Sequence, residues 1–284
     1  MNPYLELVRA PAALTVLGDT VAGAAVSGRP LTGRRLLLPL ASVALYWSGM
    51  ALNDWSDRGL DATERPERPI PSGRVSPGAA LATATALTAA GLGIAAWAGG
   101  RDSARVAVLL AGAIWSYDTV LKSTPAGPAA MAACRGLDVL LGAGRARAAS
   151  ALPAATAMAA HTFAVTALSR GEVHGGSPEV ARAAVGGTVL TALAAVGGPA
   201  RSWRHRVAGA VAAAGYAASV GRAQYAAAVD PSAATVRGAT KAGIHGMVPL
   251  QSALAARAGS AAGAAVVALA LPLARRLSRK VSPT

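Results

Sequence analysis

Ten apolar stretches follow one another along this chain, separated by short polar connections. Several are rich in Ala and Gly and only moderately hydrophobic. A helix needs about 20 mostly apolar residues to cross a bilayer, so the chain is long enough for nine or ten crossings joined by short loops. The stretches cover residues 8–27, 36–52, 77–98, 106–121, 126–144, 151–168, 180–196, 207–220, 242–256 and 261–274.

The composition favours a membrane protein as well. Of the 284 residues, 53% are hydrophobic and only 14% are charged, whereas a soluble domain has about 25% charged residues. Small residues let neighbouring helices approach closely, which compensates for weak insertion of single spans. Because no internal repeat or long linker is visible, we expect residues 1–284 to form one domain. The predicted fold is all-α: a polytopic transmembrane bundle of nine or ten helices.

The net charge of +14 does not indicate a nucleic-acid partner. The basic residues are scattered through the connections, and aromatic residues make up only 4% of the chain, so no basic stripe with stacking aromatics is present. The single cysteine, Cys134, excludes an internal disulfide framework and a thiolate metal cluster. We expect it to be a small packing residue in a multi-pass protein of the cell membrane.

The most informative polar segment, residues 53–76, follows the second apolar stretch with the sequence NDWSDRGLDATERPERPIPSGRVS. Asn53, Asp54, Asp57 and Asp61 would fall within an arc of about 100° on a helix, that is, on one face. Three carboxylates and an amide at a membrane boundary need a counter-charge. Hard oxygen ligands suit Mg²⁺, which binds one or two carboxylates together with substrate phosphates.

Paired Arg-Pro units come directly after these acidic residues. The prolines cannot continue a helix, so we expect residues 65–73 to form an extended loop. Arg65 and Arg68 would then lie beside the acidic face, and guanidinium groups pair well with phosphate oxygens. Metal-binding carboxylates next to arginines predict a diphosphate site. The alternative is a solvated loop with balanced charge.

Loop charge predicts which side of the membrane this segment occupies. With a cytoplasmic amino terminus, the Asp-rich loop is cytoplasmic and brings Arg58, Arg65 and Arg68 to that side, in agreement with the positive-inside rule. The arginines of segments 29–35 and 201–206 fall on the opposite side and weaken the bias.

These motifs resemble a known family. The pattern NDxxDxxxD followed by RPxRPIPSG, after the second span of a polytopic helical protein, resembles the first signature of the UbiA superfamily of intramembrane prenyltransferases. Within it, YDTVLK at 117–122 and ACRGLDVLLG at 133–142 look most like the EboC group. The resemblance implies Mg²⁺-dependent transfer of an isoprenyl group from a prenyl diphosphate to a lipophilic, aromatic or similar acceptor within the bilayer.

The resemblance also implies roles for individual residues. Asn53, Asp54, Asp57 and Asp61 would hold Mg²⁺ on the diphosphate, with Asp54 and Asp57 acting in catalysis. Arg68 and Lys122 would neutralise the departing diphosphate. Tyr117 and Arg65 would contact the substrate. The alternative for the 117–122 segment is an interfacial tyrosine and a snorkelling lysine.

Arg135 and Asp138 lie three residues apart inside the fifth apolar stretch. Ionisable residues within a span are costly and usually face the interior of the bundle. They would form a structural ion pair with each other, or they would line the substrate cavity. The resemblance implies the cavity, with Asp138 in place of the usual Asn.

The family places a second Asp-rich motif after the sixth span, where this chain has only Ser169–Glu172. Glu172 would ligate a metal there, or Arg170 would touch phosphate directly. We expect His161, His245 and Gln251 to be packing or cavity-lining groups.

Two other functions compete with prenyl transfer. One is a terpene-cyclising relative that ionises a diphosphate without an acceptor. The other is a non-catalytic or transport-associated protein that binds lipid diphosphate. Arg170 and Glu172 discriminate: side chains directed toward the Asp-rich loop would favour an enzyme, and side chains facing solvent would favour a binding protein. A secondary transporter would need internal symmetry and broken helices in both halves, and neither is visible.

Overall fold

The computed structural model describes residues 2–277, which form helices and connections without any β-strand. The all-α prediction is therefore confirmed for this part of the chain. Short 3₁₀ segments precede α2, α3 and α7, and a π-helical turn, Tyr117–Leu121, follows α5. The helices are α1 (Pro3–Leu7), α2 (Leu17–Val26), α3 (Leu38–Ser56), α4 (Arg58–Glu64), α5 (Pro77–Ser116), α6 (Gly127–Ala143), α7 (Ala148–Ser169), α8 (Pro178–Gly197), α9 (Trp203–Val229), α10 (Ala233–Arg257) and α11 (Ala261–Leu277).

Each apolar stretch seen in the sequence lies in helical structure. Two of them, 77–98 and 106–121, belong to the single element α5, whose helical conformation is interrupted at Gly100 with φ +68°. Only glycine adopts this backbone region without a steric cost, so Gly100 lets the chain turn between the two halves. Four segments are long and apolar enough to cross a membrane: Gly33–Ser56, Pro77–Leu121, Arg145–Ser169 and Pro178–Gly197. A total of nine or ten crossings remains a prediction.

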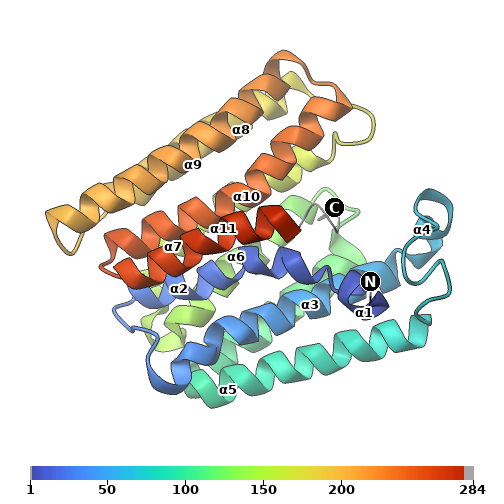
Figure 1. Cartoon of the computed structure of the whole chain (residues 1–284), viewed down its shortest axis with the longest axis horizontal. Helices are drawn as coiled ribbons and strands as arrows, with labels where there is room; N and C mark the ends of the chain where they lie inside the picture. The colour runs from blue at the N-terminus through green and yellow to red at the C-terminus, as the bar shows by residue number, and fades with distance from the viewer. Residues whose placement is uncertain (1, 278–284) are drawn as a thin grey trace.

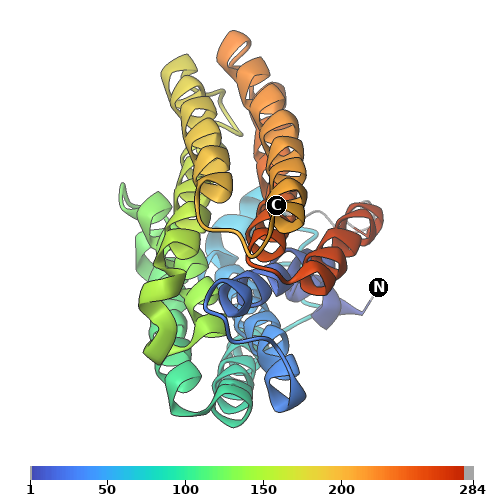
Figure 2. The ribbon, with the colours of Figure 1, turned by 90° about the vertical axis from the view of Figure 1, so that its left-hand side faces the viewer.

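The long helices lie side by side in a bundle (Figure 1). At one side α3 packs against α5, and at the other α8 packs against α9, which in turn packs against α10. The α8–α9 pair projects from the rest of the bundle in the rotated view (Figure 2). Helices α2, α6 and α7 lie between these two sides and connect them.

Glycines hold α2 and α6 close together. A Cβ atom on Gly23 would lie 1.8 Å from the carbonyl oxygen of Val139, and one on Gly142 would lie 2.0 Å from that of Thr20. The two backbones are therefore in contact, as expected for small residues between membrane helices. This contact brings Asp19 on α2 beside Arg135 and Asp138 on α6.

The two ends of the bundle differ in charge. One end, called here the arginine end, gathers the connections α2–α3, α6–α7, α8–α9 and α10–α11 and the Gly100 turn of α5. Arg29 Nη1 donates to the carbonyl oxygen of Ala143, and the backbone N–H of Arg201 donates to that of Arg257. Among the described residues, eleven arginines and one carboxylate lie at this end: Arg29, Arg34, Arg35, Arg101, Asp102, Arg105, Arg145, Arg147, Arg201, Arg204, Arg206 and Arg257.

The Asp-rich loop lies at the opposite end, beside α1 and α4 (Figure 1). Carboxylates there accompany the arginines and lysines, for example in the pairs Glu6–Arg74 and Asp57–Lys122. Because both ends are rich in basic residues, loop charge does not single out one of them as cytoplasmic. The cytoplasmic placement of the Asp-rich loop therefore remains a prediction.

Candidate functional site

The Asp-rich segment does not present its four polar residues on one helical face. Helix α3 ends at Ser56, Asp57 is its C-cap with ψ near 2°, and α4 begins at Arg58. The break directs the side chains into two groups. Asp54 and Asp61 face arginines, whereas Asn53 and Asp57 face the turn after α5. The prediction of one continuous face is wrong, because it assumed a helix that does not continue past Asp57.

The first group is a buried set of ion pairs. Arg68 Nη1 lies 2.7 Å from Asp61 Oδ2 and 3.3 Å from Asp54 Oδ1. Arg9 Nη2 donates to the same Asp54 oxygen at 3.0 Å. Asp54 and Asp61 are only 3% and 2% exposed. Buried charges need such partners, so this group fixes the Asp-rich loop against the start of the chain.

The second group joins the Asp-rich segment to the π-helical turn after α5. Lys122 Nζ lies 2.7 Å from Asp57 Oδ1, and Asn53 Nδ2 donates to Asp118 Oδ1 at 3.3 Å. The backbone N–H of Lys122 donates to Tyr117 five residues earlier. Single π-turns inside helices are frequent at functional sites. The side chains of Asn53 and Asp57 are only partly buried, whereas Asp118 is 3% exposed and Lys122 Nζ is buried.

The Arg-Pro segment forms compact turns, so the prediction of an extended loop over residues 65–73 is wrong. Turn hydrogen bonds run from Arg68 N to the Arg65 carbonyl at 3.0 Å and from Val75 N to the Pro69 carbonyl at 2.9 Å. Ile70 and Val75 are buried against the apolar core. Burial of these side chains folds the prolines into turns. Arg65 remains exposed at the end of α4.

A cavity of about 80 Å³ lies next to the second group. Tyr117 and Asp118 line one part of it, Arg135 and Asp138 another, and most of the remaining wall is apolar. Gly49 leaves room for Asp118, because a Cβ there would lie 3.2 Å from Asp118 Oδ2. The carboxylate-bearing turn and the residues predicted for the substrate cavity therefore border the same space.

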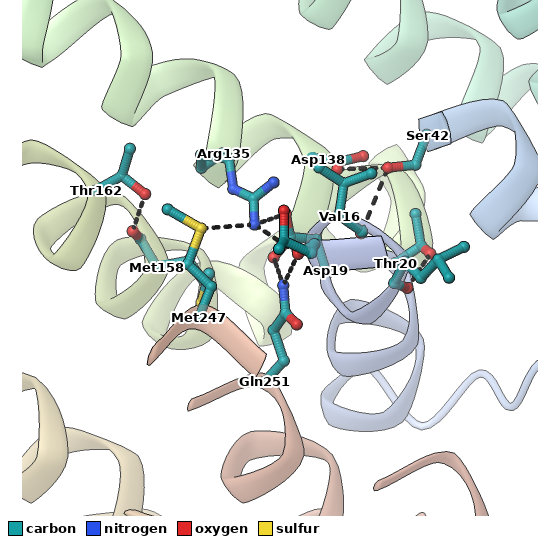
Figure 3. Close-up of polar contacts among 12 residues, drawn as sticks. Val16, Asp19, Thr20, Ser42, Arg135, Asp138, Met158, Thr162, Met247 and Gln251 are labelled. Carbon is teal, nitrogen blue, oxygen red and sulfur yellow. Dashed lines mark hydrogen bonds and ion pairs between the residues drawn. The ribbon is translucent and has the colours of Figure 1, made fainter. Parts of the chain in front are cut away.

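Arg135 does not pair with Asp138, contrary to one of the two alternatives considered from sequence. Its Nη2 lies 3.1 Å from Asp19 Oδ2 and donates to the Thr15 carbonyl at 2.9 Å. Gln251 Nε2 donates to Asp19 Oδ1 at 2.7 Å, so the network joins α2, α6 and α10 (Figure 3). Helix periodicity placed Arg135 above Asp138, but the close approach of α2 supplies a nearer carboxylate.

Asp138 instead accepts a hydrogen bond from Ser42 Oγ at 2.5 Å through Oδ2 (Figure 3). Its Oδ1 has no hydrogen-bond partner within the described part of the chain. A buried carboxylate oxygen without a partner is costly. The neighbouring Asp19 carboxyl also interacts with Asp138. Asp138 lines the cavity, where a hydroxyl group of a bound molecule would donate to its carboxylate.

The loop after α7 holds Arg170 and Glu172, and it does not bring them to Asp57. Arg170 donates to the carbonyl oxygen of Thr124, close to the turn that carries Tyr117. Glu172 is half-buried, and burial raises the pKa of its carboxyl, an effect opposed by the Thr240 hydroxyl and by Arg237 and Arg65. Arg170 thus neighbours the candidate site, whereas Glu172 interacts with α10 and the end of α4.

His161 is a packing residue, as expected. Its Nδ1 lies 2.8 Å from Tyr216 Oη and its Nε2 lies 2.9 Å from the Gly243 carbonyl. Both ring nitrogens are therefore used within the bundle. Cys134 is buried and free, and it lines the cavity.

The oxygen donors around the π-turn fit a magnesium ion shared with phosphate. Within residues 2–277, no three His, Cys, Asp or Glu side chains are arranged to hold a metal alone. Mg²⁺ is commonly bound by one or two carboxylates with the remaining positions filled by water and substrate phosphates. Asn53, Asp57 and Asp118 provide such a donor set beside the cavity.

Sequence reasoning missed four residues of this region: Arg9, Asp19, Asp118 and Gln251 as a network member. Asp19 was detectable, because a lone carboxylate inside an apolar stretch is costly and needs a partner. Asp118 belongs to the quoted 117–122 segment, one residue after Tyr117. Arg9 carried no local signal, since its partner Asp54 is 45 residues away.

Comparison with known proteins connects this site to one family. The model of the UbiA prenyltransferase family matches residues 13–172. The digeranylgeranylglyceryl phosphate synthase of Methanopyrus kandleri is 38% identical over 126 residues, which is 44% of this chain and 46% of that protein. The protein of the same name from Ignicoccus hospitalis is 40% identical over 127 residues, 44% of this chain and 40% of that protein. The chain thus matches less than half the length of these curated relatives.

Two solved structures share the fold. One, from work on digeranylgeranylglyceryl phosphate synthase in membranes, superposes with a TM-score of 0.65 at 18% identity, covering 90% of this chain and 97% of the other. The other, an apo structure of a UbiA homolog from Aeropyrum pernix K1, gives a TM-score of 0.62 at 17% identity, with coverage of 85% and 96%. At these identities the likeness establishes the fold alone.

Proposed function

The chain belongs to the UbiA prenyltransferase family, and from this premise we propose that it transfers an isoprenyl group from a prenyl diphosphate to a lipophilic acceptor within the membrane. The observation that carries the proposal is that Asp118 lines one largely apolar cavity and lies beside the Asp57–Lys122 ion pair. A prenyl diphosphate needs phosphate-binding groups for its head and an apolar cavity for its hydrocarbon chain.

The donor binds with its diphosphate at the π-turn and its hydrocarbon chain in the cavity. Lys122 Nζ contacts a diphosphate oxygen in place of Asp57, and Tyr117 borders the first carbons of the chain. Positive charge at this position stabilises the negative charge that grows on the departing diphosphate. The allylic C–O bond breaks, and the apolar cavity wall keeps water away from the carbon centre.

Asn53, Asp57 and Asp118 would hold Mg²⁺ against the diphosphate. When bound, the ion supplies further charge neutralisation on the phosphate oxygens. Asp54, Asp61 and Arg68 have a different part in this proposal. Their mutual ion pairs fix the loop that presents Asp57, so they act as positioning residues.

The acceptor occupies the part of the cavity lined by Arg135 and Asp138. Its nucleophilic hydroxyl donates a hydrogen bond to the Asp138 carboxylate, which lines this part of the cavity. The acceptor oxygen then forms the new bond to the allylic carbon, and its proton passes to the Asp138 carboxylate to which the hydroxyl already donates. Ser42 holds Asp138 in the required orientation.

The acceptor class is the least constrained part of the proposal. The names of the relatives denote a glyceryl phosphate that carries two geranylgeranyl groups, which favours a glycerol-based hydroxyl over an aromatic ring. We carry this preference to the present chain as a hypothesis. The closer resemblance to the EboC group gains no support from these relatives and remains a prediction.

A transfer assay tests the function. Purified protein in lipid nanodiscs receives radiolabelled geranylgeranyl or farnesyl diphosphate with Mg²⁺, together with a panel of glycerol-based and aromatic acceptors. We expect a labelled lipid-soluble product that depends on both the acceptor and the metal. Binding of the labelled donor without turnover over the whole panel would instead favour a diphosphate-binding protein. A labelled hydrocarbon formed without any acceptor would favour a cyclising relative.

A further inference from the structure

A second cavity lies at the arginine end, far along the helices from the Asp-rich loop. It has a volume of about 520 Å³ and is formed by α2, the connection to α3, and the α10–α11 turn. Its wall is mostly apolar, with Val21, Leu31, Leu36 and Val266 among the lining side chains. Leu36 and Val266 are also 60% and 67% exposed on the outer surface. The cavity therefore continues onto an apolar surface of the kind that faces lipid tails.

Arg201 is the charged residue of this cavity. Its backbone N–H donates to the Arg257 carbonyl at 3.2 Å. Its side-chain stem runs over Gly259, where an added Cβ would lie 2.3 Å from Arg201 Cδ. The stem is thus placed by the α10–α11 turn. Among the described residues, no carboxylate lies within ion-pair distance of the Arg201 guanidinium, which leaves its five donors for a ligand.

The surroundings place Arg201 at the level of lipid headgroups. Trp203, two residues later, is 70% exposed, and Trp97 next to the Gly100 turn is 62% exposed. Exposed tryptophans are typical of the boundary between hydrocarbon and water. Eleven arginines share this end with the single carboxylate Asp102 in the described chain, and two nitrogen atoms of Arg35 are buried there without a partner. The end therefore has a strong positive potential.

We propose that this second cavity binds one anionic glycerophospholipid, with the phosphate on the Arg201 guanidinium and an acyl chain along the apolar wall. Guanidinium binds phosphate oxygens in a bidentate manner, and the excess of arginines favours an anionic over a zwitterionic headgroup. A free phosphate ion would use Arg201 but would leave the apolar wall uncovered. The lipid satisfies both features, so we assign it as the occupant. This site is independent of the prenyl-transfer site.

Native mass spectrometry of the delipidated, detergent-solubilised protein tests the assignment. Phosphatidylglycerol and phosphatidylcholine with identical acyl chains are titrated separately, and inorganic phosphate is added as a competitor. We expect one phosphatidylglycerol to be retained, phosphatidylcholine to bind more weakly, and phosphate to displace neither. A direct hydrogen bond to a charged group contributes about 1.5–3 kcal/mol, so Arg201→Gln lowers the affinity roughly ten- to a hundredfold.

Arg105→Gln is the matched control, because Arg105 is an exposed arginine of the same end that does not line the cavity. It removes the same charge and leaves phosphatidylglycerol binding nearly unchanged. Equal losses in the two variants would indicate diffuse attraction and overturn the site. Equal retention of phosphatidylcholine would overturn the headgroup assignment, and displacement by inorganic phosphate would identify a free-anion site instead. Thermal unfolding without added lipid verifies that both variants remain folded.

Discussion

Lys122 Nζ lies 2.7 Å from Asp57 Oδ1 and thereby connects the π-turn after α5 to the break between α3 and α4. The two residues are 65 positions apart and come from the two motifs that resemble the prenyltransferase signatures. In this state the lysine occupies the position where a divalent cation would neutralise Asp57. In the proposed function a metal-bound diphosphate would replace this ion pair, so that Asp57 would help hold the metal and Lys122 would pair with phosphate.

Substitution of Asp57 tests the metal side of this exchange. Asp57→Ala is expected to abolish Mg²⁺-dependent binding of a prenyl diphosphate, because the donor set loses its partly exposed carboxylate. Isothermal titration with and without Mg²⁺ measures the effect, and insertion into membranes is verified by fractionation. Glu64→Ala is the control, since Glu64 is an exposed acid on the same segment. Unchanged Mg²⁺-dependent binding by the Asp57 variant would refute the assignment.

Substitution of Lys122 tests whether this residue binds the diphosphate of the donor. A hydrogen bond to a charged group contributes about 1.5–3 kcal/mol, so Lys122→Gln is expected to weaken donor binding by roughly ten- to a hundredfold. Lys122→Arg keeps the positive charge and should therefore retain part of the donor affinity that the Gln variant loses. Both dissociation constants are measured with the same labelled diphosphate. If the Gln variant binds as tightly as the unmodified protein, Lys122 is only the partner of Asp57 and not a ligand of the substrate.

The Asp19–Arg135 pair is expected to stabilise the bundle as well as shape the cavity. Asp19→Leu leaves the Arg135 guanidinium buried with one partner fewer, and removal of one partner of a buried pair costs about 3–5 kcal/mol. Thermal unfolding in detergent should show a markedly lower midpoint. The double variant Asp19→Leu/Arg135→Met removes both charges and should recover much of the loss. A double variant less stable than the single one would show that the two residues stabilise the bundle independently.

Glu172 gives a pH-dependent prediction. Burial raises the pKa of its carboxyl above the ordinary value of 4.5, so the folded protein binds the proton more tightly than the unfolded chain. The contribution is fully present below about pH 4.5 and is lost as the pH rises through the higher pKa of the folded state. The unfolding midpoint of the unmodified protein should therefore fall as the pH rises over this interval, and Glu172→Gln should make this fall smaller. The same pH profile in both proteins would mean that Glu172 titrates normally.

Much of the fold was predictable, for reasons that lie in local composition. Apolar stretches of membrane length become helices in almost any context, because a backbone in lipid has to satisfy its own hydrogen bonds. The stretches 77–98 and 106–121 show the limit of this reasoning. The sequence separates the two stretches correctly, but only the backbone of Gly100 shows that the helical conformation between them is interrupted at a single residue.

The candidate site, like the fold, was only partly predictable from the sequence. The residue types Asn53, Asp57 and Lys122, and the chemistry of oxygen donors beside a cation, follow from the amino-acid sequence and need no coordinates. Which residues pair with one another does not follow from the sequence, because it depends on which side chains lie close together after the helices pack. Arg135 binds Asp19 rather than Asp138, since Gly23 and Gly142 let α2 approach α6 until the backbones touch. A charge buried in the bundle pairs with the nearest opposite charge, and only the packed helices determine which one that is.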